Sequence, residues 1–238
     1  MPDPTRPSRP TQRQRLLREQ LTDARSGRVL VVSHCLLNEN VRYLGGAAHP
    51  GPLPQILHAA LDHDLGLVQM PCPEQHAWGG VLKTHMLALS GRGGRWAARD
   101  RLREPLSWAI SQYTRRRVTP LARRVARDLG QYQDAGMHVV AVVGVGSSPS
   151  CGVSCTMDLD GALADIAGCP LQTLTRTRMT EIVSTRTRPG PGIFTAALQT
   201  ALRRQHVTVP FVEHDLLAEL AGVHDLPEAV QRLFQTRP

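Results

Sequence analysis

Three short apolar runs, each followed by a cysteine, are the feature that most constrains the fold of this chain. The runs cover residues 29–32, 65–70 and 139–145, and the cysteines that follow them are Cys35, Cys72 and Cys151. Short apolar runs rich in β-branched residues are typical of strands buried on both faces, as in parallel sheets. Open α/β sheets bind their ligands beyond the carboxyl ends of such strands. We therefore expect the three thiols to meet at one place if the strands are parallel neighbours.

The stretches between these runs have helical patterns. Residues 52–64 carry apolar side chains at helical spacing, and residues 104–135 form a longer helical region that we expect to be interrupted near Pro120. Later expectations are irregular structure after Cys151 as far as Gly161, a helix at 194–204 and a strand at 207–212. Alternating strands and helices indicate right-handed crossovers. The sequence therefore predicts a single α/β domain with a mainly parallel, Rossmann-like sheet and flanking helices.

Residues 1–27 differ in composition from the rest of the chain. They begin with a stretch rich in proline and arginine, which predicts a basic disordered arm, and continue with a short helix at about residues 11–24. Residues 28–238 are predicted to be the α/β catalytic domain. No run approaches the roughly 18 apolar residues needed to span a bilayer, and no apolar stretch follows the first arginines as it does in a secretory signal. We expect no membrane partner.

The chain has five cysteines in 238 residues. They are few and widely separated, which argues against the disulfide framework of a small secreted domain. We therefore expect a reducing, cytoplasmic location, with the cysteines present as thiols, thiolates or metal ligands.

The formal net charge is +8, and arginine supplies nearly all of the positive charge because Lys83 is the only lysine. Eleven arginines fall between residues 92 and 127, where Asp100 and Glu104 are the only acidic residues. Such a basic stripe is typical of surfaces that bind phosphate backbones or an anionic partner. A solvated helix face is the simpler interpretation, and both stay open here.

Four chemistries would use three cysteines at strand ends. Structural zinc prefers ligand pairs separated by two to four residues, and here Cys151 and Cys155 alone have that spacing. A cysteine hydrolase needs one nucleophile and a base, which leaves two thiols without a role. Inert buried thiols are common. An iron–sulfur cluster uses thiolate ligands, and three of them on four irons leave one iron open as a Lewis acid.

Four motifs occur along the chain in the order Ser33-His34-Cys35-Leu36-Leu37, Cys72-Pro73-Glu74, Ser148-Pro149-Ser150-Cys151-Gly152 and Gly190-Pro191-Gly192-Ile193-Phe194-Thr195. Together they resemble the domain of unknown function 523 family, the 2-thiouracil desulfurases, over about residues 28–217. The resemblance implies a [4Fe-4S] cluster on Cys35, Cys72 and Cys151, with an open iron that captures a thiocarbonyl sulfur. It also implies that Glu74 and Ser148 handle protons and position the water, a role that suits a carboxylate.

The remaining candidate site residues are predicted to bind the substrate. We expect His34, Asn38, Asn40 and Ser150 to contact it. The chain has His34 where the family usually has alanine, and residues 38–43 and 75–80 also differ from the usual family segments. The substrate is therefore left as a thiolated pyrimidine in the form of a free base, a nucleoside or a thiolated tRNA.

Two other functions stay open. The first is a protein that binds or senses through a [4Fe-4S] cluster without turnover. The second is a nucleic-acid-binding module that uses the arginine-rich helix and keeps a structural metal site, with an affinity that falls steeply with salt.

Overall fold

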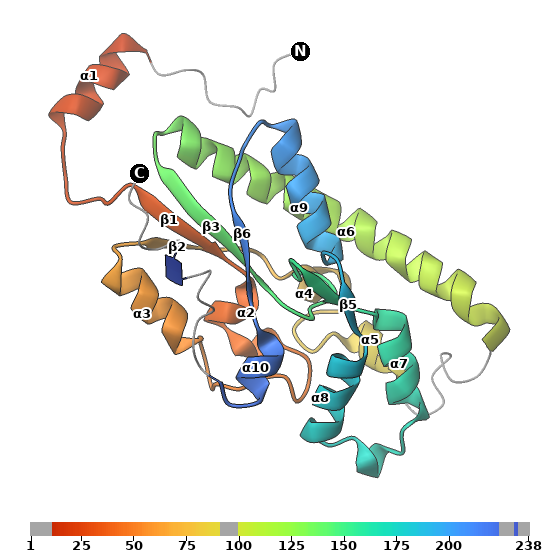
Figure 1. Cartoon of the computed structure of the whole chain (residues 1–238). Helices are drawn as coiled ribbons and strands as arrows, with labels where there is room; N and C mark the ends of the chain where they lie inside the picture. Colours follow the sequence, from red (N-terminus) through yellow and green to blue (C-terminus); the bar gives the residue numbers. More distant parts are fainter. Residues whose placement is uncertain (1–10, 91–99, 224–230, 233–238) are drawn as a thin grey trace.

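In the computed structural model, a four-stranded parallel sheet forms the centre of the molecule (Figure 1). The structure describes residues 11–90, 100–223, 231 and 232. The strands are β1 (Arg28–Val32), β2 (Gly66–Gln69), β3 (His138–Val145), β4 (Cys155–Met157), β5 (Thr187–Pro189) and β6 (Phe211–His214). The order in the sheet is β2-β1-β3-β6, and β4 and β5 form a separate antiparallel pair. The three strands that precede the cysteines are therefore parallel neighbours, as predicted.

Helices connect and cover these strands. They are α1 (Gln12–Gln20), α2 (His34–Leu37), α3 (Pro54–Asp62), α4 (Pro73–Ala77), α5 (Thr84–Ser90), α6 (Asp100–Asp134), α7 (Leu159–Gly168), α8 (Arg176–Thr185), α9 (Ile193–Arg204) and α10 (Leu216–Leu220), with 3-10 turns η1 (Glu39–Val41) and η2 (Leu171–Thr173). From β1 the chain goes to β2 on one side of it, and then crosses to β3 on the other side of β1. The direction in which strands are added to the sheet therefore reverses at β1 and β3. Ligands of doubly wound sheets bind at such a reversal.

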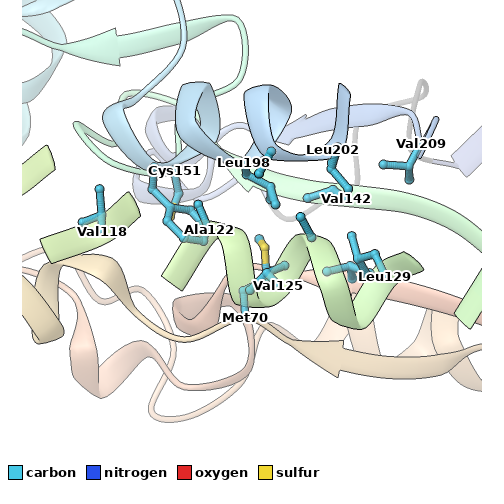
Figure 2. Close-up of a cluster of buried hydrophobic side chains, with 14 of the residues drawn as sticks. Met70, Val118, Ala122, Val125, Leu129, Val142, Cys151, Leu198, Leu202 and Val209 are labelled. Carbon is cyan, nitrogen blue, oxygen red and sulfur yellow. The ribbon is translucent and has the colours of Figure 1, made fainter. Parts of the chain in front are cut away.

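Side chains of successive strand residues point to opposite faces, and each face of the sheet is covered. On one face, Val29 and Val31 pack with α6 and α9 in a cluster that also holds Cys151 (Figure 2). On the other face, Leu30 and Val32 pack with α2, α3 and α10. Burial on both faces explains why the strands read as continuous apolar runs. The predicted α/β class and the flanked parallel sheet are confirmed.

Helix α6 is one continuous helix, so the predicted interruption near Pro120 is wrong. Proline removes the hydrogen bond to the carbonyl four residues earlier, here that of Arg116. Both Pro120 and Arg116 are exposed, so the freed carbonyl can bind water. One residue earlier in the chain, the Thr119 hydroxyl donates to the Arg115 carbonyl at 2.7 Å. The helix therefore tolerates the proline on its outer face.

Two other local expectations are wrong. The last strand begins at Phe211 rather than near Val207, because the ladder with β3 starts where the Pro210 carbonyl accepts from Val142 N at 2.9 Å. Residues 155–161 form β4 and the start of α7 instead of irregular structure.

The N-terminal helix is present as α1, and Thr11 and Gln14 form a reciprocal capping box at its start. Residues 1–10 of the predicted arm lie outside the described residues. None of the helices in the described part of the chain is long and apolar enough to cross a membrane.

Candidate functional site

Cys35, Cys72 and Cys151 line one cavity of about 580 Å³. It lies beyond the carboxyl ends of β1, β2 and β3, where α5, α7 and α8 also gather (Figure 1). One wall carries the cysteines and polar side chains. The opposite wall is apolar and comes mainly from α5, α7 and α8, through Met86, Leu163, Met179 and other residues. A polar end facing an apolar wall is typical of sites for small, largely apolar ligands.

Each cysteine is held by a different local structure. Cys35 lies in α2, the short helix that directly follows β1. Cys72 is the N-cap of α4, and its Sγ accepts from Gln75 N at 3.4 Å, so its sulfur is fixed against that helix. Cys151 is buried in the loop after β3, and its carbonyl accepts from Val145 N at 3.0 Å.

The loop of Cys151 is built as a rigid support. The Ser148 hydroxyl accepts from Cys151 N at 3.0 Å and from Ser150 N at 3.3 Å, which closes a tight turn. The loop then seats on the start of α9, where the Ser150 carbonyl accepts from Phe194 N and Thr195 N. At Gly192 the two backbones touch, since a Cβ there would lie 2.4 Å from the Ser150 carbonyl. The first amides of α9 are thus used by the loop itself.

Glu213 holds the far side of the same loop. Its Oε2 accepts from Val153 N at 2.6 Å and from Ser154 N at 2.8 Å. Burial opposes its charge, but hydrogen bonds from Ser154 and Val153 lower the pKa of Glu213 overall. The Cys155 thiol donates to Glu213 Oε1 at 3.2 Å and is not among the residues that line the cavity. Cys155 therefore belongs to the support of the loop.

Glu74 faces the cavity beside the two serines. Its Oε1 accepts from the Ser150 hydroxyl at 2.8 Å and from the Ser148 hydroxyl at 3.4 Å. Its Oε2 lies 3.5 Å from Lys83 Nζ, and both side chains are largely buried. The Lys83 ammonium also donates to the Val41 carbonyl. The structure thus brings Glu74 and Ser148 together, with Ser150 as the closer hydroxyl.

Burial raises the pKa of all three cavity thiols, because a thiolate is poorly solvated there. The pKa of Cys72 rises to about 12 through burial and the nearby Glu74 carboxylate. Cys35 also raises the pKa of Cys72, and both raise the pKa of Cys151. Arg42 and Lys83 act in the opposite direction and lower the pKa of Cys35. Three thiols near two cations, one buried and two partly buried, form a site that a metal centre would convert to thiolates.

The separation of the sulfur atoms distinguishes between kinds of metal. Ligands of one tetrahedral zinc lie about 3.8 Å apart, given Zn–S bonds of about 2.3 Å. The three sulfurs Cys35, Cys72 and Cys151 do not all lie within 4.8 Å of one another. In a multinuclear cluster each thiolate binds its own iron, so the sulfurs are spaced more widely. Three thiols on one cavity are thus a donor set of the kind that a multinuclear cluster uses.

The expected substrate contacts fall into two groups. His34 and Ser150 line the cavity, and burial lowers the pKa of His34 against a hydrogen bond to the Met70 backbone. Asn38 and Asn40 are not among the lining residues. Instead, Asn38 Oδ1 accepts from Asn40 Nδ2 at 2.8 Å and from Asn40 N at 3.2 Å, which caps η1. Their contact with substrate stays a prediction.

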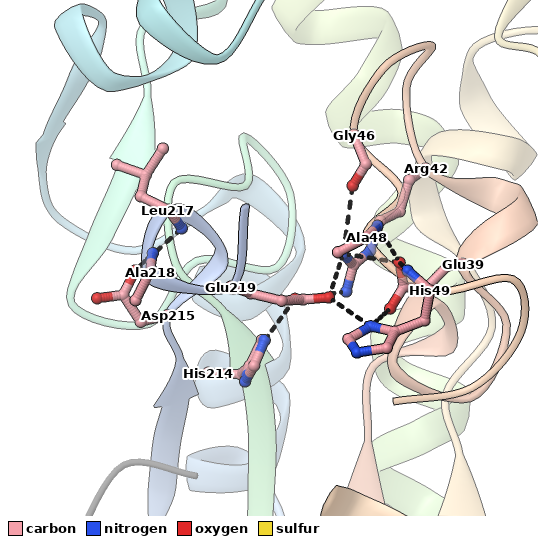
Figure 3. A network of polar contacts seen from close by, with 10 residues as sticks. All are labelled: Glu39, Arg42, Gly46, Ala48, His49, His214, Asp215, Leu217, Ala218 and Glu219. Carbon is pink, nitrogen blue, oxygen red and sulfur yellow. Dashed lines mark hydrogen bonds and ion pairs between the residues drawn. The ribbon is translucent and has the colours of Figure 1, made fainter. Parts of the chain in front are cut away.

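A second polar cluster lies next to the cavity (Figure 3). Arg42 pairs with both oxygens of Glu219, at 2.8 and 3.0 Å, and lies 3.1 Å from Glu39. His49 Nδ1 bridges the two carboxylates at 2.8 and 3.2 Å, and His214 Nε2 lies 2.6 Å from Glu219. The ligand atoms of Glu39, His49 and Glu219 are close enough to hold a metal ion. The Arg42 guanidinium already lies between the two carboxylates and pairs with both, so we interpret this group as a structural charge network.

Sequence reasoning missed Arg42 and Lys83 as cavity residues. Arg42 lines the cavity and also anchors the network, and its Nε is a buried donor without a hydrogen bond. Lys83 reaches the cavity from a backbone with φ 52°, a left-handed conformation that favours glycine. That Lys83 is the only lysine was a signal in the sequence, but nothing local indicated where it points.

Comparison with protein-family models, curated proteins and solved structures finds no match to this chain.

Proposed function

We propose that this protein is an iron–sulfur-dependent desulfurase that converts a thiolated pyrimidine to its oxo form and releases sulfide. The observation that carries the proposal is the convergence of three thiols from three adjacent parallel strands on one cavity with Glu74 and Ser148. Fold alone would not support it, because doubly wound sheets serve many reactions.

The residues present fit a [4Fe-4S] cluster. Cys35, Cys72 and Cys151 would hold it, since all three line the same cavity. The buried, unpaired Nε of Arg42 offers a donor for a cluster or cysteine sulfur, and such hydrogen bonds tune a cluster. When bound by three thiolates, the cluster supplies a Lewis-acidic iron that can polarise a thiocarbonyl.

The reaction exchanges sulfur for the oxygen of water, so the thiocarbonyl and one water give a carbonyl and hydrogen sulfide with no net electron transfer. In this proposal Glu74 takes a proton from the attacking water; its carboxylate lines the cavity and accepts from the Ser150 hydroxyl at 2.8 Å. The hydroxyls of Ser148 and Ser150 orient that carboxylate, and Lys83 fixes its other oxygen. The apolar wall excludes bulk water and packs against the pyrimidine ring.

Replacement of Glu74 tests this role. With the protein reconstituted anaerobically, we expect Glu74→Gln to lower kcat/KM for sulfide release from 2-thiouracil by about 100-fold or more, the usual contribution of a general base. Absorbance near 400 nm should stay as in the wild type, because Glu74 is not a ligand. Glu181→Gln is the matched control, since Glu181 is an exposed carboxylate paired with Arg178 on α8. Unchanged turnover in Glu74→Gln would overturn its role, and no turnover by loaded wild-type protein on any thiolated pyrimidine would overturn the proposed function.

A further inference from the structure

A second cleft, of about 960 Å³, runs between α6 and α9 and past β4, β5 and α7. It adjoins the cysteine cavity, because five residues line both: Trp78, Pro149, Met157, Leu159 and Leu163. Trp78 is fixed at this junction, where its Nε1 donates to Thr114 Oγ1 at 3.0 Å. We call this cleft the arginine groove.

Positive charge dominates the lining of the arginine groove. Its charged residues are the exposed Arg115, Arg123, Arg127, Arg188 and Arg204, together with Asp158 and Asp160. Among the described residues, Arg115, Arg123, Arg188 and Arg204 form no ion pair. Like charges one turn apart, as at Arg123 and Arg127, slightly destabilise a helix. With five arginines against two aspartates, the groove keeps an excess of positive charge.

The dimensions of the groove favour an extended anion. Arg115 and Arg127 are twelve residues apart on one helix, which corresponds to about 18 Å. One phosphate group cannot contact both, whereas a chain of phosphates can. Trp108 lies two turns before Arg115 on the same face of α6 and is 67% exposed. Trp108 is not among the residues that line the groove, but it lies on the helix that carries the groove arginines. An exposed aromatic ring beside basic side chains is typical of surfaces that bind single-stranded nucleic acid by stacking.

We propose that the arginine groove binds a single-stranded polynucleotide through its phosphates. Because Trp78 and Pro149 line both hollows, a strand bound in the groove would lie beside the cysteine cavity, and we infer that it presents one base there. The proposal that the groove binds a polynucleotide depends only on the features of the groove. The proposal that the bound strand delivers a thiolated base to the cavity rests on the proposed desulfurase function. Arginines 92, 95, 99, 101 and 103 of the same stripe lie outside the residues whose side chains the structure describes, and they carry none of this argument.

Neighbouring arginines give a matched test. The groove variant is Arg115→Gln with Arg123→Gln and Arg204→Gln, and the control variant is Arg116→Gln with Arg124→Gln and Arg203→Gln. The control removes the same charge from the same helices at residues that do not line the groove. The probe is a fluorescein-labelled single-stranded RNA of about twelve nucleotides, a length within the range that such surfaces cover. Fluorescence anisotropy on cluster-free protein reports its binding.

Loss of three phosphate contacts should lower the slope of log affinity against log salt by about 2, and weaken binding about 100-fold at 0.1 M salt. The control variant should bind within a few fold of the wild type. Equal losses in both variants, or no binding by the wild type, would overturn the proposal. Displacement of the RNA by polyglutamate of equal charge and at equal concentration would overturn the assignment to phosphates.

Turnover then separates delivery from desulfuration. We expect the groove variant to lose about 100-fold in kcat/KM for an RNA that contains one thiouridine, and to keep its rate on free 2-thiouracil. Turnover of the free base without turnover of the RNA would overturn delivery and leave the desulfurase function intact. RNA binding without turnover of either substrate would overturn the desulfurase function and leave the groove assignment intact.

Discussion

Two buried polar regions meet at the carboxyl end of the sheet, and they differ in how their charges are satisfied. In the charge network of Figure 3, both oxygens of Glu39 and of Glu219 are paired within the protein. In the cysteine cavity, three thiols with raised pKa values face open space, and Arg42 Nε has no partner. Arg42 belongs to both regions.

The difference teaches where to look for a function. Glu39, His49 and Glu219 have the residue types of a metal site, but the carboxylate oxygens already have partners in Arg42, His49, His214 and the backbone. The three thiols line a cavity, where their sulfurs remain available to a ligand. Residues that stabilise the fold should therefore be separable by mutation from residues that hold a ligand. The following variants test that separation, in order of decreasing effect on stability.

Glu219→Gln should have the largest effect on stability. Removing this buried carboxylate leaves the Arg42 guanidinium without its main partner, and breaking a buried pair costs about 3 kcal/mol or more. We expect the midpoint of urea unfolding to fall accordingly. The exposed Glu181→Gln serves as the control and should change the free energy of unfolding by less than about 1 kcal/mol. A Glu219→Gln loss no larger than that of the control would contradict the structural role of the network.

The pH dependence of the free energy of unfolding also tests the structural role of Glu219. Burial opposes ionisation, but hydrogen bonds from His214 and Arg42 hold the pKa of Glu219 well below its usual range. A depressed folded pKa contributes stability that is present above the unfolded pKa of about 4.3 and is lost as the pH falls further. Below that pH the wild type should lose up to about 1.4 kcal/mol per pH unit through this group. Urea titrations between pH 5 and 3 should show a shallower acid limb in Glu219→Gln; parallel limbs would exclude Glu219 as the cause.

Gly192→Ala should have an intermediate effect. Its Cβ would overlap the Ser150 backbone, and forced overpacking costs about 1–3 kcal/mol. Because the loop shifts as a unit, iron loading should fall together with the free energy of unfolding. Gly168→Ala is the control, since a Cβ at Gly168 meets nothing within 4 Å. Full stability in Gly192→Ala would show that the close contact between the loop and α9 is not required.

Cys72→Ser should have the smallest effect on stability. The side chain is partly exposed and accepts one backbone hydrogen bond, which serine can also accept. We expect cluster-free Cys72→Ser to unfold within about 1 kcal/mol of the wild type, while it no longer retains iron after reconstitution. A loss of stability as large as that of Glu219→Gln would remove the distinction between the two regions.

The sequence was informative where local patterns decide the structure. Runs such as 139–145 predicted buried parallel strands, and their exits placed Cys35, Cys72 and Cys151 together. Contacts between residues far apart in the chain could not be predicted from the sequence. Arg42 and Glu219 are 177 positions apart, and no local sequence pattern indicates that they pair. Local rules also failed where surroundings compensate, as at Pro120, whose freed carbonyl faces solvent.

The central claim is that the three thiols together hold a four-iron cluster, and anaerobic reconstitution tests it most directly. Iron and acid-labile sulfide would be counted in the wild type, in Cys151→Ser and in Cys169→Ser, whose thiol lies outside the cavity. The account predicts about four irons and four sulfides per chain, with absorbance near 400 nm, in the wild type and in Cys169→Ser, and their loss in Cys151→Ser. Equal loading of all three proteins, or no loading of the wild type, would contradict it.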